Sequence, residues 1–111
     1  MTTIFGKIIA GELPAEKVFE NDRILAIKDI NPQAPIHFLI MPKKEISSIQ
    51  EMKEEDFPLL GEMVHVAQEL AKKYNVSHGY RLLTNIGRDA GQTVFHFHLH
   101  LIGGRHLGPM A

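Results

Sequence analysis

The sequence has 111 residues, of which 44% are hydrophobic and 23% charged, with a formal net charge of −1 and no cysteine. This size and balance are typical of one globular domain, and we take residues 1–111 as that domain. The near-neutral charge gives no electrostatic basis for binding nucleic acid or an anionic membrane, and disulfides and thiolate chemistry are excluded. The first residues lack a signal-peptide pattern and no apolar run approaches membrane-spanning length, so we expect a cytoplasmic protein.

The first residues predict a short amphipathic helix. Thr2 or Thr3 can act as its N-cap, because a threonine hydroxyl accepts a hydrogen bond from an unpaired N–H of the first turn. Apolar residues then recur at helical spacing and form one stripe: Ile4, Phe5, Ile8 and Ile9. Gly11 and Pro14 follow, and both favour the end of a helix.

Three strands are expected next. Residues 16–20 and 23–28 have the composition of strands and are separated by a hairpin-type turn. Residues 29–35 contain two prolines and an asparagine, which predicts a rigid, non-helical loop. Residues 36–41 are almost wholly apolar and are followed by Pro42, so we expect this strand to lie inside the sheet with both faces covered.

The second half of the chain predicts a long helix from Glu55 to Tyr74. Pro58 fits its first turn, where the missing N–H of proline is harmless. Apolar residues at spacings of three and four predict its buried stripe: Phe57, Leu60, Val64, Ala67, Ala71 and Tyr74. Residues 80–84 then read as a strand and residues 85–93 as a polar loop that contains glycine.

Residues 94–102 carry the clearest functional pattern. Aromatic and β-branched residues alternate with other types over this stretch, which predicts a strand in which residues two apart share a face. One face would carry three histidines: His96, His98 and His100. The opposite face would pack on a core: Phe95, Phe97, Leu99 and Leu101. A row of imidazoles opposite a wholly apolar face is unusual for packing alone and therefore indicates function.

Two kinds of chemistry fit this row. Neighbouring imidazoles can converge on a metal ion, but His96 and His100 would be about 13 Å apart on a straight strand, so a metal would need a further ligand from elsewhere. Alternatively, a neutral imidazole is a nucleophile for a phosphorus or acyl centre near pH 7, and its neighbours can bind anionic oxygens or pass protons. His37 alone is best interpreted as a core histidine with a satisfied hydrogen bond, and beside the row it becomes a candidate orienting partner.

The motifs together resemble those of the histidine triad superfamily, and most closely its Hint branch, the histidine triad nucleotide-binding proteins. The segment His96-Phe97-His98-Leu99-His100-Leu101 is similar to the triad signature, in which histidines alternate with apolar residues. The resemblance extends over essentially the whole chain and includes four other motifs: Ile4-Phe5-Gly6-Lys7-Ile8-Ile9, Asp29-Ile30-Asn31-Pro32-Gln33-Ala34-Pro35 with His37 after it, Gly91-Gln92-Thr93, and Gly103-Gly104-Arg105.

The order of the elements predicts an α+β domain, because strands and helices do not alternate regularly. The resemblance adds a HIT-like fold with a five-stranded, mainly antiparallel sheet, one long helix and one short helix. It also implies a homodimer in which two sheets join into one continuous sheet, and a pocket for a purine nucleotide of the AMP or GMP type. It implies no required cofactor and no metal.

The activity implied by the resemblance is hydrolysis of purine nucleoside phosphoramidates and aminoacyl-adenylates to the nucleoside monophosphate. His98 would be the nucleophile that forms a nucleotidyl-histidine intermediate, and His100 would contact the phosphate or the leaving group. His96 and His37 would orient the other histidines and relay protons. Asp29 would hold the ribose hydroxyls, with Ile30 beside the base. The other implied nucleotide-binding residues are Asn85, Gly91, Gln92 and Thr93 on the phosphate side, and Ile4, Phe5, Ile8 and Ile27 in the apolar purine slot.

Simpler interpretations remain open for several of these residues. Asp29, Asn85 and Thr93 are also common turn residues, and the early apolar stripe also fits an ordinary core. Arg88 is expected to be solvated rather than bound to phosphate. For the whole chain, the alternatives are a dinucleoside polyphosphate hydrolase of the same superfamily and a non-catalytic nucleotide-binding or scaffold module.

Overall fold

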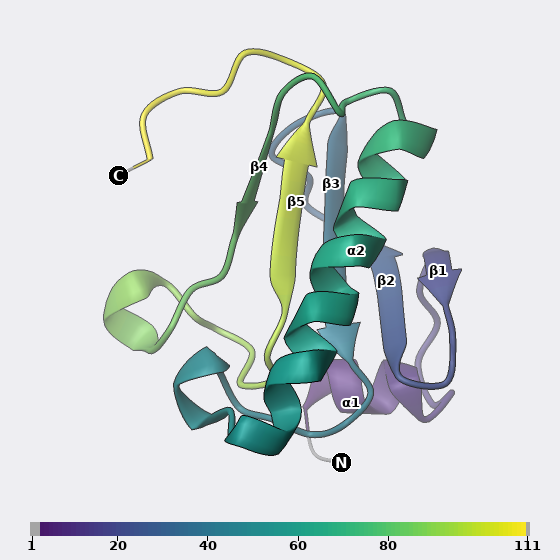
Figure 1. Cartoon of the computed structure of the whole chain (residues 1–111), viewed down its shortest axis with the longest axis vertical. Coiled ribbons are helices and arrows are strands. Elements are labelled where there is room, and N and C mark those ends of the chain that lie inside the picture. Colours follow the sequence, from purple (N-terminus) through teal and green to yellow (C-terminus); the bar gives the residue numbers. More distant parts are fainter. Residues whose placement is uncertain (1–2, 111) are drawn as a thin grey trace.

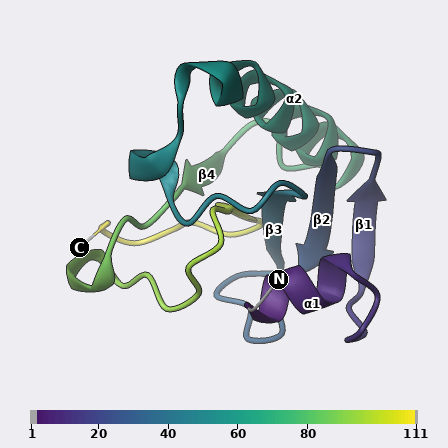
Figure 2. The same cartoon turned by 90° about the horizontal axis from the view of Figure 1, so that it is seen from below.

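Five antiparallel strands form one sheet with a helix on each face. The computed structural model describes residues 3–110, and the order of strands across the sheet is β1-β2-β3-β5-β4. The strands are β1 (Lys17–Glu20), β2 (Ile24–Lys28), β3 (Ile36–Pro42), β4 (Tyr80–Leu83) and β5 (Leu99–Gly103). Helices α1 (Ile4–Ile9) and α2 (Phe57–Lys73) lie on opposite sides of this sheet (Figures 1 and 2). Within residues 3–110, no helix is long and apolar enough to cross a bilayer.

Helix α1 covers one face of the sheet near the ends of β2 and β3. Its N-cap is Thr3, whose hydroxyl accepts a hydrogen bond of 3.0 Å from the backbone N–H of Gly6. The alternative cap, Thr2, lies outside the described residues. Phe5 and Ile8 are buried in a small core with four residues of β2 and β3: Leu25, Ile27, Leu39 and Met41. Ile4 is instead 49% exposed, so only part of the predicted stripe is core.

Helix α2 covers the other face, but its buried side is rotated from the predicted stripe. The residues that it buries are Met63, Val66, Ala67, Leu70 and Ala71. Phe57 and Val64, which were expected in the core, are 53% and 37% exposed. The prediction was wrong because the helix carries two overlapping apolar stripes that share the two alanines. Spacing alone cannot tell which stripe faces the sheet.

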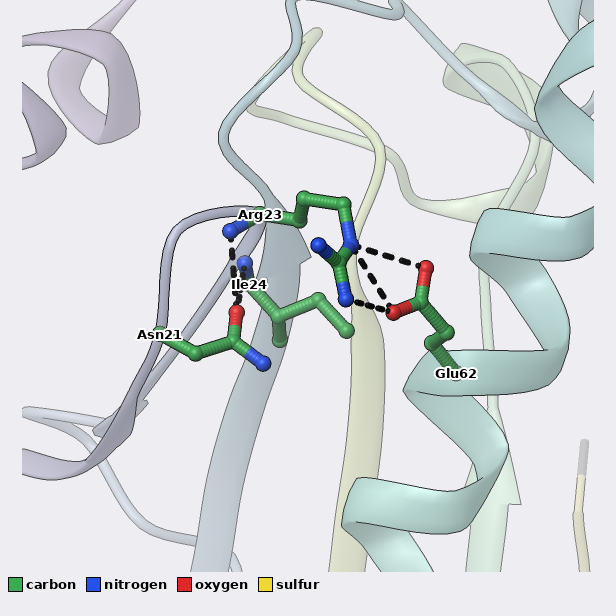
Figure 3. A network of polar contacts seen from close by, with 4 residues as sticks. All are labelled: Asn21, Arg23, Ile24 and Glu62. Carbon is green, nitrogen blue, oxygen red and sulfur yellow. Dashed lines mark hydrogen bonds and ion pairs between the residues drawn. The ribbon is translucent and has the colours of Figure 1, made fainter.

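An ion pair shows how the helix is rotated (Figure 3). The Nε of Arg23, at the turn between β1 and β2, donates hydrogen bonds of 2.8 and 3.1 Å to the carboxylate of Glu62 on α2. In the same turn, the Oδ1 of Asn21 accepts hydrogen bonds from the backbone N–H groups of Arg23 and Ile24. Successive residues turn by about 100° around a helix, so Phe57 and Val64 lie on the flank away from Glu62. That flank faces the side of the sheet that ends in β4.

The histidine strand is shorter than predicted. The sequence suggested residues 94–102, whereas β5 begins only at Leu99. The chain leaves the sheet before that point, and the N–H of Phe97 bonds to the carbonyl of Ile46 at 2.6 Å rather than to β3. The alternation of faces still holds, because Phe97, Leu99 and Leu101 pack in the core under α2. Phe95 was expected there too and is 39% exposed, since it lies in the segment outside the sheet.

Candidate active site

A cavity of about 810 Å³ opens on the face of the sheet that carries α1. Its walls come from α1 and the segment after it, the end of β2, the loop 29–32 and the polar loop before the triad. All of the predicted nucleotide-binding residues line it: Ile4, Phe5, Ile8, Ile27, Asp29, Ile30, Asn85, Gly91, Gln92, Thr93, His98 and His100. His37 and His96, predicted to be catalytic, do not line it.

The cavity also has walls that the sequence analysis missed. These come mainly from the segment after α1 and from the edge of the Asp29 loop: Leu13, Pro14, Ala15, Glu16, Lys28, Asn31, Pro32, Leu39 and Val94. In the sequence, Pro14 was interpreted only as a helix stop. The sequence did contain a signal for this wall, the short apolar run Leu13-Pro14-Ala15. The run has neither helical nor strand spacing, so its apolar side chains must lie against an apolar surface outside a regular element.

His98 is held in one tautomer by a backbone carbonyl. Its Nδ1 lies 2.7 Å from the carbonyl oxygen of His96. A carbonyl oxygen can only accept, so Nδ1 carries the proton and Nε2 keeps a free lone pair. The ring stands edge-on to Phe5, with 4.9 Å between centroids, and burial lowers the pKa of His98 below its ordinary value. His98 therefore offers the cavity an unprotonated nitrogen at neutral pH.

His100 has the opposite arrangement of proton and lone pair on its two ring nitrogens, and a backbone amide determines this arrangement. The N–H of Gln33 donates to the Nδ1 of His37 at 3.0 Å, so a neutral His37 carries its proton on Nε2. That Nε2 lies 2.9 Å from the Nδ1 of His100 and donates to it. The proton of His100 is therefore on Nε2, the nitrogen left for the cavity. Burial and the neighbouring imidazoles of His98 and His37 lower the pKa of His100 to about 4.

His37 is buried at the centre of this chain of hydrogen bonds. Burial lowers its pKa, and the nearby carboxylate of Asp29 acts in the opposite direction. The side chain is 4% exposed, as expected of a core histidine, and it contacts His100 directly, which is compatible with the predicted role of an orienting partner.

His96 orients the site rather than contacting the cavity. Its ring is fully buried, and its Nε2 donates to the carbonyl of Pro42 at 2.7 Å. Its backbone carbonyl fixes the tautomer of His98. A proton-relay role for the His96 ring, implied by the resemblance, stays a prediction: its Nε2–H is bonded to the carbonyl of Pro42, and its Nδ1 is buried without a hydrogen-bond partner among residues 3–110.

Asp29 makes the contact of a turn residue and also lies at the cavity, so its predicted ribose role stays a prediction. Its Oδ1 accepts a hydrogen bond of 2.8 Å from the N–H of Asn31, as a turn former does. Its Oδ2 lies 3.4 Å from the Nε2 of His37, and the carboxylate also lines the cavity. The loop is fastened from outside by Arg105, whose guanidinium donates to the carbonyl of Gln33 at 2.7 Å. The carboxylate keeps lone pairs free for a ligand in the cavity.

The loop before the triad is braced by Gln92, which is 4% exposed. Its Oε1 accepts from the N–H of Gly87 at 2.8 Å, and its Nε2 donates to the carbonyls of Ser47 and Val94 at 2.8 and 3.2 Å. Gly87 and Gly91 have φ of +80° and +92°, which favour glycine. Both amide N–H groups of Gln92 are used inside the protein, so its side chain shapes the loop instead of offering donors to a phosphate.

For Asn85 and Thr93, the sequence left open whether they are turn residues or contacts to a ligand. Thr93 is exposed and Asn85 is half-buried, and both line the cavity. Arg88 lies outside the cavity walls and is exposed as expected, with its guanidinium 5.9 Å from the centroid of the Phe95 ring. Thr93 and Asn85 are therefore the polar side chains of this loop that remain available to a ligand.

Asp29, His37 and His100 form the one group in residues 3–110 with the spacing of a metal site, because their nearest ligand atoms lie within 4.8 Å of one another. The hydrogen bonds around them favour a proton over a metal. A metal on the Nε2 of His37 would need the proton on Nδ1, which would then face the N–H of Gln33 donor to donor. Metal-bound histidines normally donate their other N–H to an acceptor.

Comparisons with known proteins agree with this geometry. A family model described as "Scavenger mRNA decapping enzyme C-term binding" matches residues 2–111. An uncharacterised HIT-like protein of Chlamydia muridarum is 48% identical over 111 residues, which cover 100% of this chain and 88% of that protein. The crystal structure of a HIT family hydrolase from Legionella pneumophila is 47% identical, with a TM-score of 0.92 and 95% of each chain covered.

The chain belongs to the histidine triad superfamily. A histidine triad protein from Clostridium difficile matches 100% of the chain and 97% of its own length, with a TM-score of 0.94 and 38% identity. A histidine triad nucleotide-binding protein from Candida albicans matches with a TM-score of 0.83 and 32% identity, and 99% of this chain and 84% of that chain are covered. The predicted HIT-like α+β fold is confirmed.

Proposed function

We propose that this histidine triad protein hydrolyses purine nucleoside phosphoramidates and aminoacyl-adenylates to the nucleoside monophosphate, as a member of the Hint branch. One observation carries the proposal: His98 and His100 line one cavity with opposite polarity at Nε2. A lone pair and an N–H donor, on rings whose centroids are 5.0 Å apart, are what a nucleophile and a hydrogen-bond donor to the phosphate or the leaving group require. Relatives named as a hydrolase and as a nucleotide-binding protein support it.

The first step forms a covalent intermediate. The Nε2 lone pair of His98 attacks the α-phosphorus and the P–N bond breaks, while the Nε2–H of the neutral His100 donates a hydrogen bond to the departing amine, which takes its proton from solvent water. With an aminoacyl-adenylate, the P–O bond to the acyl group breaks instead, and the amino acid leaves through its carboxylate oxygen without needing a proton. As His98 becomes bonded to phosphorus it gains positive charge, which the carbonyl of His96 stabilises through the Nδ1–H.

The second step releases the nucleotide. The oxygen of a water molecule attacks the phosphorus and its proton passes to solvent, while His100 stays neutral and keeps its Nε2 proton. The P–N bond to His98 then breaks, and His98 returns to its starting protonation state. His37 keeps the proton of His100 on the correct side throughout, because its own Nδ1 is occupied by the N–H of Gln33.

The remaining walls suit a nucleoside monophosphate. Asp29 is an acceptor placed beside the histidines and fits two vicinal ribose hydroxyls. Asn85 and Thr93 lie on the side of the loop that would meet the phosphate. Apolar side chains of α1 and β2 would enclose the base: Ile4, Phe5, Ile8 and Ile27.

The decisive experiment compares the intact protein with the His98→Asn variant on adenosine 5′-phosphoramidate. We expect the intact protein to release AMP and a quenched reaction to contain a nucleotidyl group on His98, detectable by peptide mass spectrometry. The variant should lose both the adduct and turnover by at least about 10³-fold, and should still bind AMP in calorimetry. Normal turnover by the variant would remove His98 as the nucleophile.

The same assay separates the alternatives. Faster turnover of a diadenosine polyphosphate than of the phosphoramidate would favour a dinucleoside polyphosphate hydrolase. Binding of AMP without turnover of either compound would favour a non-catalytic nucleotide-binding module. Activity that is unchanged after treatment with a chelator is expected, because the proposed steps use only protein groups.

We also propose that the protein is a homodimer with a continuous sheet. Strand β4 is an edge strand of the sheet (Figure 1). Phe57 and Val64 are exposed and lie on the flank of α2 opposite Glu62, toward the β4 side. An open edge beside exposed apolar side chains favours pairing with a second copy. Sedimentation velocity should give twice the monomer mass, and Phe57→Glu should shift the protein toward the monomer.

A further inference from the structure

The β4–β5 ladder ends at His100, two residues from the nucleophile His98. Its last paired residues are Leu83 and His100, and β5 begins only at Leu99. His98 therefore lies outside the sheet, in a segment that backbone hydrogen bonds to β3 and β4 do not hold. The proposed reaction needs the Nε2 of this residue within a fraction of an ångström of its position, so something else must fix its backbone.

A side chain takes the place of the missing ladder bond. The hydroxyl of Thr84, the first residue after β4, donates a hydrogen bond of 2.8 Å to the carbonyl oxygen of His98. His98 is then held at two points: its ring through the carbonyl of His96, and its own carbonyl through Thr84. The ring contact fixes the tautomer, and the Thr84 contact fixes where the main chain of His98 lies.

Thr84 also joins two parts of the cavity. The next residue, Asn85, begins the loop that lines the phosphate side, and Gln92 braces the other end of that loop. Thr84 itself is not among the residues that line the cavity. Its hydroxyl can therefore affect a reaction there only by setting the distance between the loop and His98.

We propose that Thr84 is a positioning residue for the nucleophile. The proposal rests on the assignment of His98 in the proposed function. The residue type matters in a specific way, because valine has nearly the same shape as threonine but no donor, whereas serine keeps the donor and loses only a methyl group. The two substitutions separate the hydrogen bond from the packing.

The test compares Thr84→Val and Thr84→Ser with the intact protein on adenosine 5′-phosphoramidate. The valine variant should nucleotidylate His98 about three to ten times more slowly in single-turnover experiments, with AMP affinity in calorimetry changed by less than about twofold. The serine variant should recover most of the rate. Asn21→Ala is the control for general destabilisation, because it removes two hydrogen bonds in the turn between β1 and β2 and should leave the rate unchanged.

A second measurement does not depend on the chemical reaction. Nitrogen-15 spectra of the histidine rings report which ring nitrogen is protonated, and in the intact protein His98 should show a single Nδ1–H tautomer. In the valine variant the main chain of His98 is no longer fixed, so its ring should move relative to the carbonyl of His96 and its signals should shift toward an average of both tautomers. The signals of His96 in this variant, and all signals of the serine variant, should not change. If the phosphoramidate is not a substrate at all, these spectra still decide the role of Thr84. Unchanged His98 signals in the valine variant would overturn the proposal. If the intact protein turns over the phosphoramidate, an unchanged rate in the valine variant would overturn it too. A loss of AMP affinity as large as the loss in rate would also overturn it.

Discussion

Replacing Gln92 by leucine tests whether its side chain braces the loop or binds phosphate. The buried amide makes hydrogen bonds to the N–H of Gly87 and to the carbonyls of Ser47 and Val94. Leucine has a similar length but can replace none of them. The substitution therefore leaves three backbone groups without their partner, in a loop that packs against the segment before α2.

The size of the effect follows from these bonds. A hydrogen bond contributes about 0.5–1.5 kcal/mol net, and water can reach part of this loop, so we expect a loss of about 2–4 kcal/mol in the free energy of unfolding. For a domain of this size, that corresponds to a fall of about 8–16 °C in Tm. The Gly87 amide should lose protection in hydrogen exchange first, because its acceptor is the amide oxygen of Gln92.

Thermal unfolding, hydrogen exchange and AMP calorimetry together provide the assay. Gln68→Leu makes the same chemical change at an exposed position of α2 and should alter stability by less than about 0.5 kcal/mol. The bracing role is refuted if Gln92→Leu unfolds like this control. An AMP affinity about tenfold weaker at unchanged stability would instead restore Gln92 as a phosphate contact.

Two further predictions concern the ligand and pH. Asp29→Ala should weaken AMP binding about ten- to a hundredfold in calorimetry, since a hydrogen bond to a charged group contributes about 1.5–3 kcal/mol; unchanged affinity would remove Asp29 from the ribose role. The folded-state pKa of His100 is lowered to about 4 from an ordinary 6.5, so below pH 6.5 the unfolded chain binds a proton that the folded chain does not. Stability to urea should therefore fall as pH drops from about 6.5 to about 4, and His100 should contribute no pH dependence above that window. For activity, the lowered pKa of His98 should keep the acid limb of the kcat/KM profile below pH 6.5. Constant stability between pH 7 and pH 5 would contradict this account.

Most of the fold was predictable because its signals are local. Three examples depend only on a few neighbouring residues: the turn at Asn21 and Asp22, the proline in the first turn of α2, and the almost wholly apolar β3. The rotation of α2 was not predictable from such signals, because Phe57 and Met63 are equally apolar and only the sheet determines which is buried. The late start of β5 also depends on a distant partner, the carbonyl of Ile46.

The candidate site shows the same division. The residue types that line the cavity follow from the triad and the resemblance of the other motifs. The polarity of each imidazole does not, because backbone groups of His96 and Gln33 set it and no side-chain pattern encodes them. For the same reason, Thr84 drew no attention in the sequence, where it was only the last residue of a predicted strand.

The amide that orients His37 belongs to the main chain, and this has a consequence for variation at position 33. The side chain of Gln33 makes only a long contact of 3.4 Å to the carbonyl of Asn31, so most replacements there should leave the direction of proton donation intact. Proline is the exception, since it alone among the common amino acids brings no N–H. The backbone N–H at position 33 determines which ring nitrogen of His100 carries the proton. Because every residue except proline supplies this N–H, nearly every single substitution at position 33 should leave the tautomer of His100 unchanged.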